Sequence, residues 1–291
     1  MVGLKIRKGK FEERLKDPSR SLSSWVGEDC CKWWGVGCSN QTGNIIKLDL
    51  KSPFFCDLMS VDTSTVCLGG VLSPSLLYLK YLNHLDRSNN KFQGISIPNF
   101  IGSLNKSSYL NLSYASFAGM IPSHLGNLSN LLYFDLYTFA YPLTPPISNL
   151  NWLSGLSSKI PQFEWPILEC SNGSLEHLNL SLNQLIGNVP HSLGYIKRLR
   201  NLQLYINTFS SSIPLSIQNL SHLEKLDLNV NMMNITISEL IGQLSELRLE
   251  SAASLKELLA SGFKKWTGST VHVNWFFVVR SFFEAVTVCF H

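Results

Sequence analysis

Catalytic motifs and charged side chains are both scarce in this sequence of 291 residues. Charged residues make up 15% of it, and residues 1–20 hold seven basic and three acidic side chains, which account for the whole net charge of +4. A nucleic-acid-binding protein carries a basic patch on its folded body, so the near-neutral remainder argues against that class. Phosphate-binding loops, nucleophile elbows, zinc-protease motifs and kinase signatures are missing. We therefore predict that the chain is not an enzyme and binds neither a cofactor nor a metal.

A period of 24 residues organises the second half of the chain. Leu178, Leu202 and Leu226 occupy the same place in three similar segments, which follow the pattern L-x-x-L-x-L-x-x-N. Leucines at alternate positions fit a short strand with one buried face. One such segment cannot bury that face alone, so successive strands must stack in parallel. The pattern predicts an α/β solenoid, the leucine-rich-repeat horseshoe, with parallel strands on its concave face.

Polar residues at fixed places in the repeat have a backbone role. Asn183, Asn207 and Asn231 follow the strands at one constant offset, where a side-chain amide can satisfy backbone groups at a sharp turn. Pro190 and Pro214 suit an extended segment on the convex side, because proline needs no hydrogen-bond partner for its nitrogen.

The first half of the chain contains imperfect copies of the same repeat. Leu85, Leu110 and Phe134 are spaced by 25 and 24 residues. Arg87 occupies an inward leucine position, where a charge must either reach solvent or strain the coil. The remaining faults are Ser107 at another inward position and Ala115 at the position of the turn asparagine.

Residues 22–38 read LSSWVGEDCCKWWGVGC. They fit the spacing W-x-x-x-x-C-C-x-W-x-G-V-x-C at Trp25, Cys30, Cys31, Trp33, Gly35, Val36 and Cys38. This segment resembles the N-terminal cap of plant leucine-rich-repeat receptors. The resemblance implies that Cys31 pairs with Cys38, and that Cys30 pairs with an upstream cysteine, which this sequence does not contain. A zinc site is the alternative, but a second Cys/His pair at a suitable distance is missing.

The loop at 51–70 contains two further cysteines. Cys56 and Cys67 can bridge each other, or one of them can pair with Cys30. Sequence spacing does not decide between these connectivities.

Composition and repeat spacing divide the chain into five segments. We expect a truncated N-terminal cap at 1–43, a first repeat block at 44–138, an irregular proline-rich interruption at 139–173, a second repeat block at 174–247, and a non-repeat tail at 248–291 that reflects a mispredicted gene end. Residues 1–20 lack the apolar core of a secretory signal peptide. Residues 271–290 are apolar, but Arg280 and Glu284 near their middle argue against a membrane span.

Glycosylation sequons are numerous. N-x-S/T begins at Asn40, Asn105, Asn111, Asn127, Asn172, Asn179, Asn219 and Asn234. Several arise from the repeat itself, but together with the cysteines of the cap they predict a glycosylated protein of an oxidising compartment.

The outward side chains of the strands form the expected ligand-binding face. Tyrosines cluster there on two adjacent repeats, and tyrosine suits contact surfaces because it joins a large apolar area to a hydroxyl. The expected contact residues are Tyr109, Tyr114, Tyr133, Asp135, Tyr137, His177, Gln203, Tyr205 and Asp227. The alternative for the Asp and Asn residues at the middle outward positions is that they are repeat consensus and merely solvated.

Residues 12–247 resemble plant leucine-rich-repeat receptor-like proteins of the disease-resistance type, similar to apple scab-resistance homologues and fungal-xylanase receptors. The resemblance implies an ectodomain at the cell surface, tethered by one membrane span. It also implies that this ectodomain perceives a microbial or peptide elicitor, which can be a pathogen protein, and signals through a co-receptor kinase. The alternatives are a secreted inhibitor or decoy, similar to polygalacturonase-inhibiting proteins, and a nonfunctional gene fragment.

Overall fold

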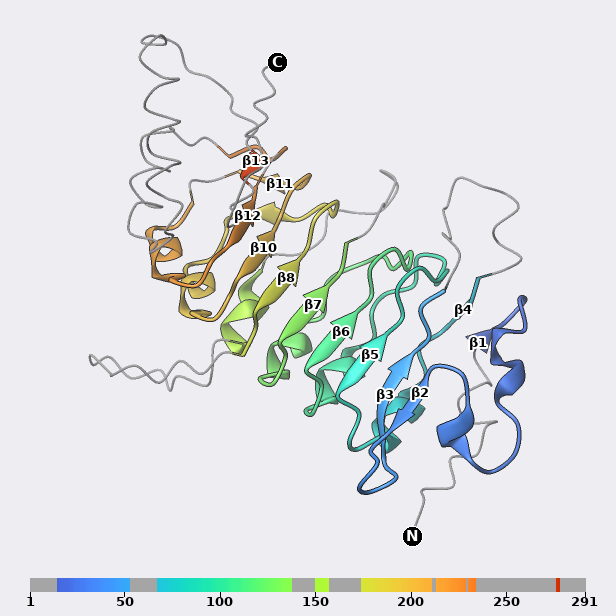
Figure 1. Cartoon of the computed structure of the whole chain (residues 1–291). Coiled ribbons are helices and arrows are strands. Elements are labelled where there is room, and N and C mark those ends of the chain that lie inside the picture. The colour runs from blue at the N-terminus through green and yellow to red at the C-terminus, as the bar shows by residue number, and fades with distance from the viewer. Residues whose placement is uncertain are drawn as a thin grey trace, which may run out of the picture. The chain divides into compact units, whose positions relative to one another are not determined.

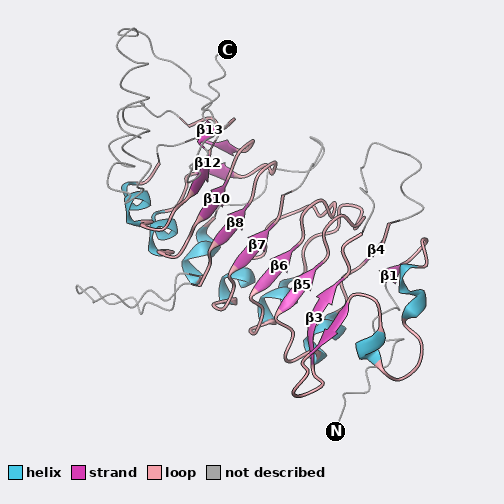
Figure 2. Ribbon diagram, in the orientation of Figure 1, coloured by secondary structure: helices cyan, strands magenta, loops and turns pink. Residues whose placement is uncertain are grey.

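The computed structural model describes residues 15–52, 67–137, 150–156, 174–210, 213–228, 230–233 and 276–277. The chain forms two compact units, Met1–Pro145 and Pro146–His291, and each is described by itself. Figure 1 labels their strands in chain order, and Figure 2 shows strands and short 3₁₀ helices alternating along each unit.

The first unit combines the cap with a parallel sheet. Its elements are β1 (Leu15–Lys16), η1 (Ser21–Ser24), η2 (Cys30–Lys32), β2 (Val36–Cys38), β3 (Ile45–Asp49), β4 (Gly69–Gly70), η4 (Pro74–Tyr78), β5 (His84–Asp86), η5 (Asn99–Ser103), β6 (Tyr109–Asn111), η6 (Ser123–Asn127) and β7 (Tyr133–Asp135). Strands β3, β5, β6 and β7 pair in parallel in that order. β2 pairs with β3 antiparallel and belongs to the cap, and β1 pairs with β4 antiparallel.

The second unit repeats the same arrangement. Its elements are η7 (Asn151–Gly155), β8 (His177–Asn179), β9 (Ile186–Gly187), η8 (His191–Tyr195), β10 (Asn201–Gln203), β11 (Thr208–Phe209), η9 (Leu215–Asn219), β12 (Lys225–Asp227) and β13 (Phe276–Phe277). β10 pairs in parallel with both β8 and β12, and β13 pairs antiparallel with β12. β9 and β11 form a second, two-stranded parallel sheet.

The strand register confirms the predicted repeat and fold class. Leu178 pairs with Leu202 and Leu202 with Leu226, and all three are buried. In the first unit Leu110 pairs with Phe134 in the same way. These inward residues therefore meet their own copies in the next coil, and within each unit the core is a stack of such side chains.

Proline marks where each coil turns away from the sheet. Pro190 and Pro214 have the extended backbone that the sequence predicts, and each directly precedes a 3₁₀ helix, η8 or η9. Proline suits this place because the helix needs no hydrogen bond from its nitrogen.

The turn asparagines fill their predicted role. Asn207 Nδ2 donates to the carbonyl of Leu204 in its own coil at 2.9 Å, and to that of Leu180 in the preceding coil at 3.0 Å. Asn231 and Asn90 bond their own and the preceding coil in the same way. In these three coils the asparagine side chain therefore ties its own coil to the preceding one.

The two inward faults of the first unit are buried. Arg87 is only 2% exposed, so the first of the two alternatives, a charge that reaches solvent, is wrong. Its Nε and Nη1 have no hydrogen-bond partner, and burial lowers the pKa of Arg87 to about 10. Ser107 is 1% exposed, and its hydroxyl has no partner either.

The segment boundaries expected at 43, 138, 173 and 247 remain predictions. Of the proline-rich stretch 139–173, the structure describes 150–156, which contain η7. Of the tail 248–291 it describes 276–277, which form β13.

Candidate functional site

A row of aromatic rings runs across the strands of the first unit. Parallel pairing places His84 beside Tyr109, and Tyr109 beside Tyr133. The rings of His84 and Tyr109 stack with centroids 4.0 Å apart, and those of Tyr109 and Tyr133 with centroids 4.4 Å apart. All three residues are half-buried. We call His84, Tyr109 and Tyr133 the aromatic row. The two tyrosines are among the contact residues expected from the sequence, whereas His84 is not.

Carboxylates lie directly beside this row. The Tyr109 hydroxyl donates to Asp86 Oδ2 at 3.2 Å, and the Tyr133 hydroxyl donates to Asp135 Oδ2 at 3.2 Å. Burial, helped by the Asp86 charge, raises the pKa of Tyr109 to about 12, and burial together with Asp135 raises the pKa of Tyr133. Both tyrosines are therefore neutral donors at physiological pH, and their rings are held in place by the acidic residues.

The middle outward positions are less open than the sequence suggested. Asp86 is 5% and Asn111 8% exposed, so the alternative of a merely solvated column is wrong for these two. The Ser88 hydroxyl donates to Asp86 Oδ1 at 2.6 Å, and the Ser113 hydroxyl donates to Asn111 Oδ1 at 2.7 Å. The side chains of Asp86 and Asn111 therefore stabilise the turn after each strand, because each accepts a hydrogen bond from the serine two residues later.

The other two predicted tyrosines also meet. The rings of Tyr114 and Tyr137 lie 4.5 Å apart at a tilt of 37°, and the Tyr114 amide donates to the Tyr137 carbonyl at 2.7 Å. Burial and a hydrogen bond with Tyr137 raise the pKa of the Tyr114 hydroxyl. The four predicted contact tyrosines of the first unit thus form two ring pairs, each between adjacent coils.

A groove of about 710 Å³ lies at the cap end of the same sheet. It is lined by Trp34, Gly35, Val36, Gly37, Lys47, Asp49, Lys51, Ser52 and Asn89. Gly37 pairs with Lys47 across the β2–β3 ladder, and a Cβ on Gly37 would lie 3.0 Å from that of Lys47. Lys47 Nζ lies 3.0 Å from Asp49 Oδ2. Lys47 also pairs in register with His84, so the groove leads onto the aromatic row.

Sequence reasoning missed this groove. The available signal was the pair Gly35 and Gly37 in the cap, because glycine has no side chain to fill the space beside the charged residues Lys47 and Asp49 of β3.

The strand face of the second unit is polar instead. His177, Asn201 and Lys225 are neighbours in register, and all are half-buried. Burial, with a smaller effect of Lys225, lowers the pKa of His177 to about 4, so this histidine is neutral at physiological pH.

Three further predicted contacts occupy this polar face. Gln203 Nε2 donates to Asn201 Oδ1 at 3.0 Å, and Tyr205 is half-buried. Asp227 is only 2% exposed, which leaves a ligand little of its surface.

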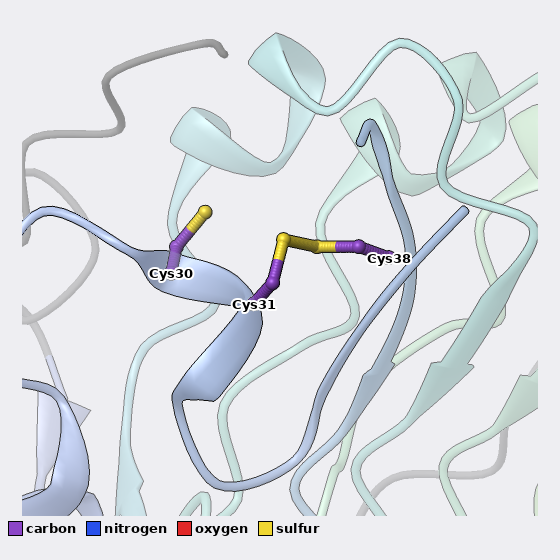
Figure 3. Close-up of side chains that lie close together, drawn as sticks. All are labelled: Cys30, Cys31 and Cys38. Carbon is purple, nitrogen blue, oxygen red and sulfur yellow. A yellow bond between two sulfur atoms is a disulfide. The ribbon is translucent and has the colours of Figure 1, made fainter. Parts of the chain in front are cut away.

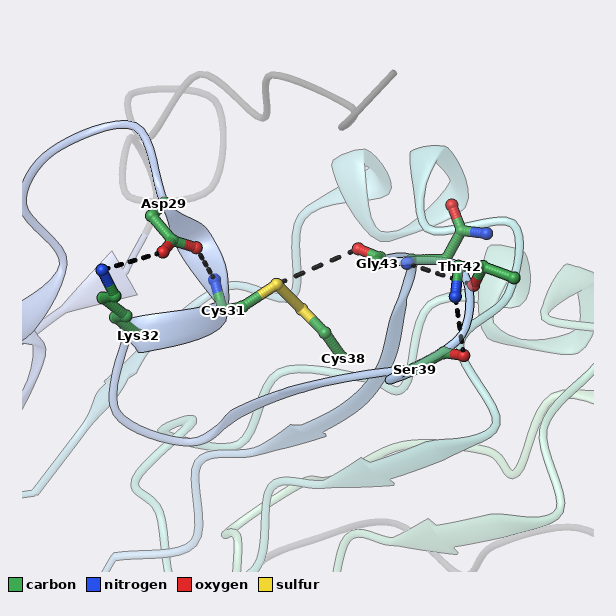
Figure 4. Close-up of a disulfide and its surroundings, with 8 residues drawn as sticks. Asp29, Cys31, Lys32, Cys38, Ser39, Thr42 and Gly43 are labelled. Carbon is green, nitrogen blue, oxygen red and sulfur yellow. Dashed lines mark hydrogen bonds and ion pairs between the residues drawn. A yellow bond between two sulfur atoms is a disulfide. The ribbon is translucent and has the colours of Figure 1, made fainter. Parts of the chain in front are cut away.

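The cap disulfide is present as the resemblance implied. Cys31 and Cys38 are bonded, with their Cα atoms 5.6 Å apart, beside the Asp29–Lys32 ion pair and the turn at Gly43 (Figure 4). Cys30 carries a free thiol next to this bond (Figure 3). With two of the three neighbouring sulfurs in a disulfide, the zinc alternative loses its ligands.

Cys67 is disulfide-bonded as well. Its partner is not Cys30, whose thiol is free, so the alternative pairing of those two residues is wrong. The bonded partner lies outside the described residues, as does Cys56, and the Cys56–Cys67 bridge remains a prediction.

The sequons fall into two groups. Asn40, Asn105, Asn127 and Asn219 are exposed and can carry glycans. Asn111 and Asn179 are 8% and 7% exposed, and each accepts a hydrogen bond from a serine amide, so we correct the expectation of glycans there. Asn172 and Asn234 lie outside the described residues.

Helices of membrane-spanning length and hydropathy do not occur among the residues that the structure describes.

Two protein families match the chain. The leucine rich repeat N-terminal domain family matches residues 10–39, and the Leucine Rich Repeat family matches residues 174–196. Among curated relatives, Receptor-like protein EIX1 of Solanum lycopersicum is 42% identical over 152 residues, which is 51% of this chain and 14% of that protein. Receptor-like protein EIX2 of the same plant is 46% identical over 114 residues, 39% of this chain and 11% of that protein. The chain thus matches only a small part of each relative.

Solved structures of plant receptor ectodomains have a similar fold. The ectodomain of the Arabidopsis receptor kinase HAESA in complex with an IDA peptide hormone is 30% identical, with a TM-score of 0.59 over 81% of this chain and 34% of that one. The PEPR1–AtPEP1 complex is 28% identical, with a TM-score of 0.58 over 77% of this chain and 27% of that one. Cap, repeats and strand register together give the chain a leucine-rich-repeat fold, and its sequence is similar to those of plant receptor-like proteins.

Proposed function

We propose that the chain is a ligand-binding leucine-rich-repeat ectodomain that perceives a microbial or peptide elicitor in plant defence. The aromatic row and the adjoining cap groove form its contact face. The observation that carries the proposal is the continuity of that face across β3, β5, β6 and β7.

The chemistry of the face suits a protein or peptide. Stacked half-buried rings offer a large rigid contact area, so little side-chain freedom is lost when a ligand binds. The Tyr109 and Tyr133 hydroxyls already bond to carboxylates, so their orientation is set before binding. The groove adds charges of both signs, from the Lys47–Asp49 pair and from Lys51, which can select among ligands.

Both the chemistry of the chain and its relatives support a cell-surface compartment. A Cys31–Cys38 disulfide and four exposed sequons suit an oxidising, glycosylating environment at the cell surface. The HAESA and PEPR1 structures contain peptide ligands on the same fold, which supports a peptide or protein partner here. Signalling through a co-receptor kinase belongs to the same proposal.

Surface plasmon resonance on the glycosylated chain tests the contact face, with a purified fungal xylanase as the probe. We expect saturable binding that weakens at least tenfold when Tyr109 and Tyr133 are both changed to Ala. Tyr195→Ala is the matched control, because Tyr195 is 45% exposed but lies on η8 rather than on the strand face.

A fungal polygalacturonase is tested in parallel, with inhibition of its activity as the readout. Inhibition that depends on the same two tyrosines would favour the secreted-inhibitor alternative over elicitor perception. If neither enzyme binds, or if binding is lost equally in Tyr195→Ala, the proposed contact face is wrong.

A further inference from the structure

An exposed tryptophan lines the cap groove. Trp34 is 38% exposed, whereas Trp25 and Trp33 of the same cap are buried. The backbone of Trp34 is held from both sides, because its amide donates to Ser24 Oγ at 2.9 Å and its carbonyl accepts from Trp25 Nε1 at 2.9 Å. The indole takes part in neither bond, so a large aromatic ring is fixed in place and remains partly open to a ligand.

The other side chains of the groove are mainly polar. Lys47, Asp49 and Lys51 occupy alternate positions along β3 and just past its end, so they lie on one face of the sheet. Lys47 and Asp49 form an ion pair, whereas Lys51 has no acidic partner among the residues that the structure describes. Asn89 contributes an amide whose side chain makes no hydrogen bond within the described part of the chain. The groove therefore offers unused donors and one uncompensated positive charge.

Bare backbone forms part of the groove wall. Gly35 has φ +76°, and a Cβ there would lie 2.2 Å from the Asp49 carbonyl oxygen, so this position requires glycine. Gly37 likewise has no side chain opposite Lys47. The volume of about 710 Å³ lies within the range of about 300–1,000 Å³ that sites for small ligands occupy. A rigid ring can therefore enter the groove and approach the backbone closely.

This combination suits a sugar better than a peptide side chain. A pyranose ring has a face of C–H bonds that packs on an aromatic ring, and hydroxyls around its rim that bond to amide, carboxylate and ammonium groups. A pocket for an apolar peptide side chain is lined mainly by apolar groups instead. The uncompensated charge of Lys51 adds a preference for a ligand with a carboxylate.

We propose that the cap groove binds an acidic oligosaccharide, with a sugar ring on Trp34 and a carboxylate at Lys51. Asn89 and the Lys47–Asp49 pair bond the ring hydroxyls. The inference rests on the proposed function and deepens it, because it names the ligand class at one end of the contact face. The aromatic row remains the place for a protein partner.

Isothermal titration calorimetry with the full glycosylated chain tests the groove, with trigalacturonate as the probe. Two matched compounds isolate the features that the groove recognises. The methyl ester of trigalacturonate keeps the sugar rings without the charge, and triglutamate keeps carboxylates without the rings. We expect saturable binding of trigalacturonate, binding of the ester that is about tenfold weaker, and no binding of triglutamate. Triglutamate that binds as tightly as trigalacturonate overturns the proposal in favour of an acidic peptide.

Two single variants place the sugar in the groove. Trp34→Ala and Lys51→Gln should each weaken trigalacturonate binding about tenfold. Both side chains are exposed, and the two hydrogen bonds that hold Trp34 come from its backbone, so both variants should fold. Tyr78→Ala and Lys106→Gln are the matched controls, because these exposed residues do not line the groove. The proposal is wrong if trigalacturonate does not bind, or if either groove variant binds it as tightly as its control.

The two ligands separate this inference from the proposed function. A chain that binds the fungal xylanase through Tyr109 and Tyr133 but does not bind trigalacturonate retains the proposed function and loses this inference alone. Trigalacturonate binding that depends on Trp34 and Lys51, in a chain that binds no xylanase, supports the groove and counts against the proposed protein partner.

Discussion

The two units solve the same turn in different ways. In the second unit the Leu185 amide donates to the side-chain oxygen of Asn207 at 3.1 Å. At the equivalent place in the first unit the asparagine is replaced by Ala115, and the Phe92 amide donates to the Ala115 backbone carbonyl at 3.0 Å. The amide is satisfied in both cases, so a missing ladder asparagine does not leave a buried donor unpaired.

The difference lies in what else the asparagine supplies. Asn207 Nδ2 also donates to carbonyls of two successive coils, and alanine offers nothing in their place. The second unit is therefore the regular version of the repeat, and the first unit tolerates a fault in hydrogen bonding together with a buried arginine. The first unit also carries the aromatic row, so the less regular coils are those with the more distinctive surface.

The largest effect should come from a feature that both units share. A Cβ on Gly194 would lie 2.0 Å from the Ser216 carbonyl oxygen, and one on Gly102 would lie 2.0 Å from the His124 carbonyl oxygen. Neighbouring coils touch there through backbone, so Gly194→Ala must push two coils apart and should cost about 3 kcal/mol. Differential scanning calorimetry measures the loss.

Gly187→Ala is the control for that substitution. Gly187 has φ +83°, but a Cβ there meets nothing within 4 Å. It should cost about 1 kcal/mol, from backbone strain alone. Equal costs at the two positions would show that the coils move apart freely.

The next largest loss of stability is expected where the turn asparagine of the second unit is replaced by alanine, the residue found at this position in the first unit. Asn207→Ala removes two carbonyl partners and the acceptor of the Leu185 amide, all of them buried, and should cost about 2 kcal/mol. Asn201→Ala is the control, since Asn201 is half-buried on the strand face and should change stability by less than about 0.5 kcal/mol. If Asn207→Ala has the same Tm as the unchanged chain, the second unit can replace the lost acceptor with a backbone carbonyl, as the first unit does at Ala115.

Much of this fold follows from sequence periodicity. Leu110 and Leu202 are predictable as inward residues because identical coils must bury identical positions. The aromatic row is partly predictable for the same reason, since any outward position recurs beside its copy in the next strand. Stacking of His84 on Tyr109 follows from that register, although histidine alone gives no sign of it.

Other features depend on contacts that periodicity does not describe. The cap groove requires an antiparallel strand to place Gly37 beside Lys47, and repeats contain no information about that pairing. The burial of Arg87 could not be predicted because its side chain is long enough to leave the core. The free thiol of Cys30 depends on connectivity, which spacing leaves open.

Arg87→Leu should give the first unit the buried leucine that the second unit has at this inward position. The equivalent positions in the second unit are Leu180 and Leu204, both fully buried. Removing a buried guanidinium with two unpartnered nitrogens should stabilise the protein by about 1 to 2 kcal/mol and raise its Tm. Arg198→Leu, at an exposed arginine, should leave Tm nearly unchanged. A Tm that stays constant or falls in Arg87→Leu would mean that the buried charge is compensated.

The smallest effect concerns the residue just before each turn asparagine. Asn89 in the first unit has φ 54°, and Ile206 and Val230 in the second have φ 50° and 52°. Left-handed backbone suits asparagine but strains a β-branched residue. Ile206 is 39% exposed, so its replacement removes little buried area. Ile206→Asn should therefore stabilise the chain by about 0.5 to 1 kcal/mol, and Asn89→Ile should destabilise it by a similar amount. Paired chemical denaturation curves measure both, and shifts of the same sign would show that contacts of the side chain, rather than backbone strain, decide which residue is tolerated there.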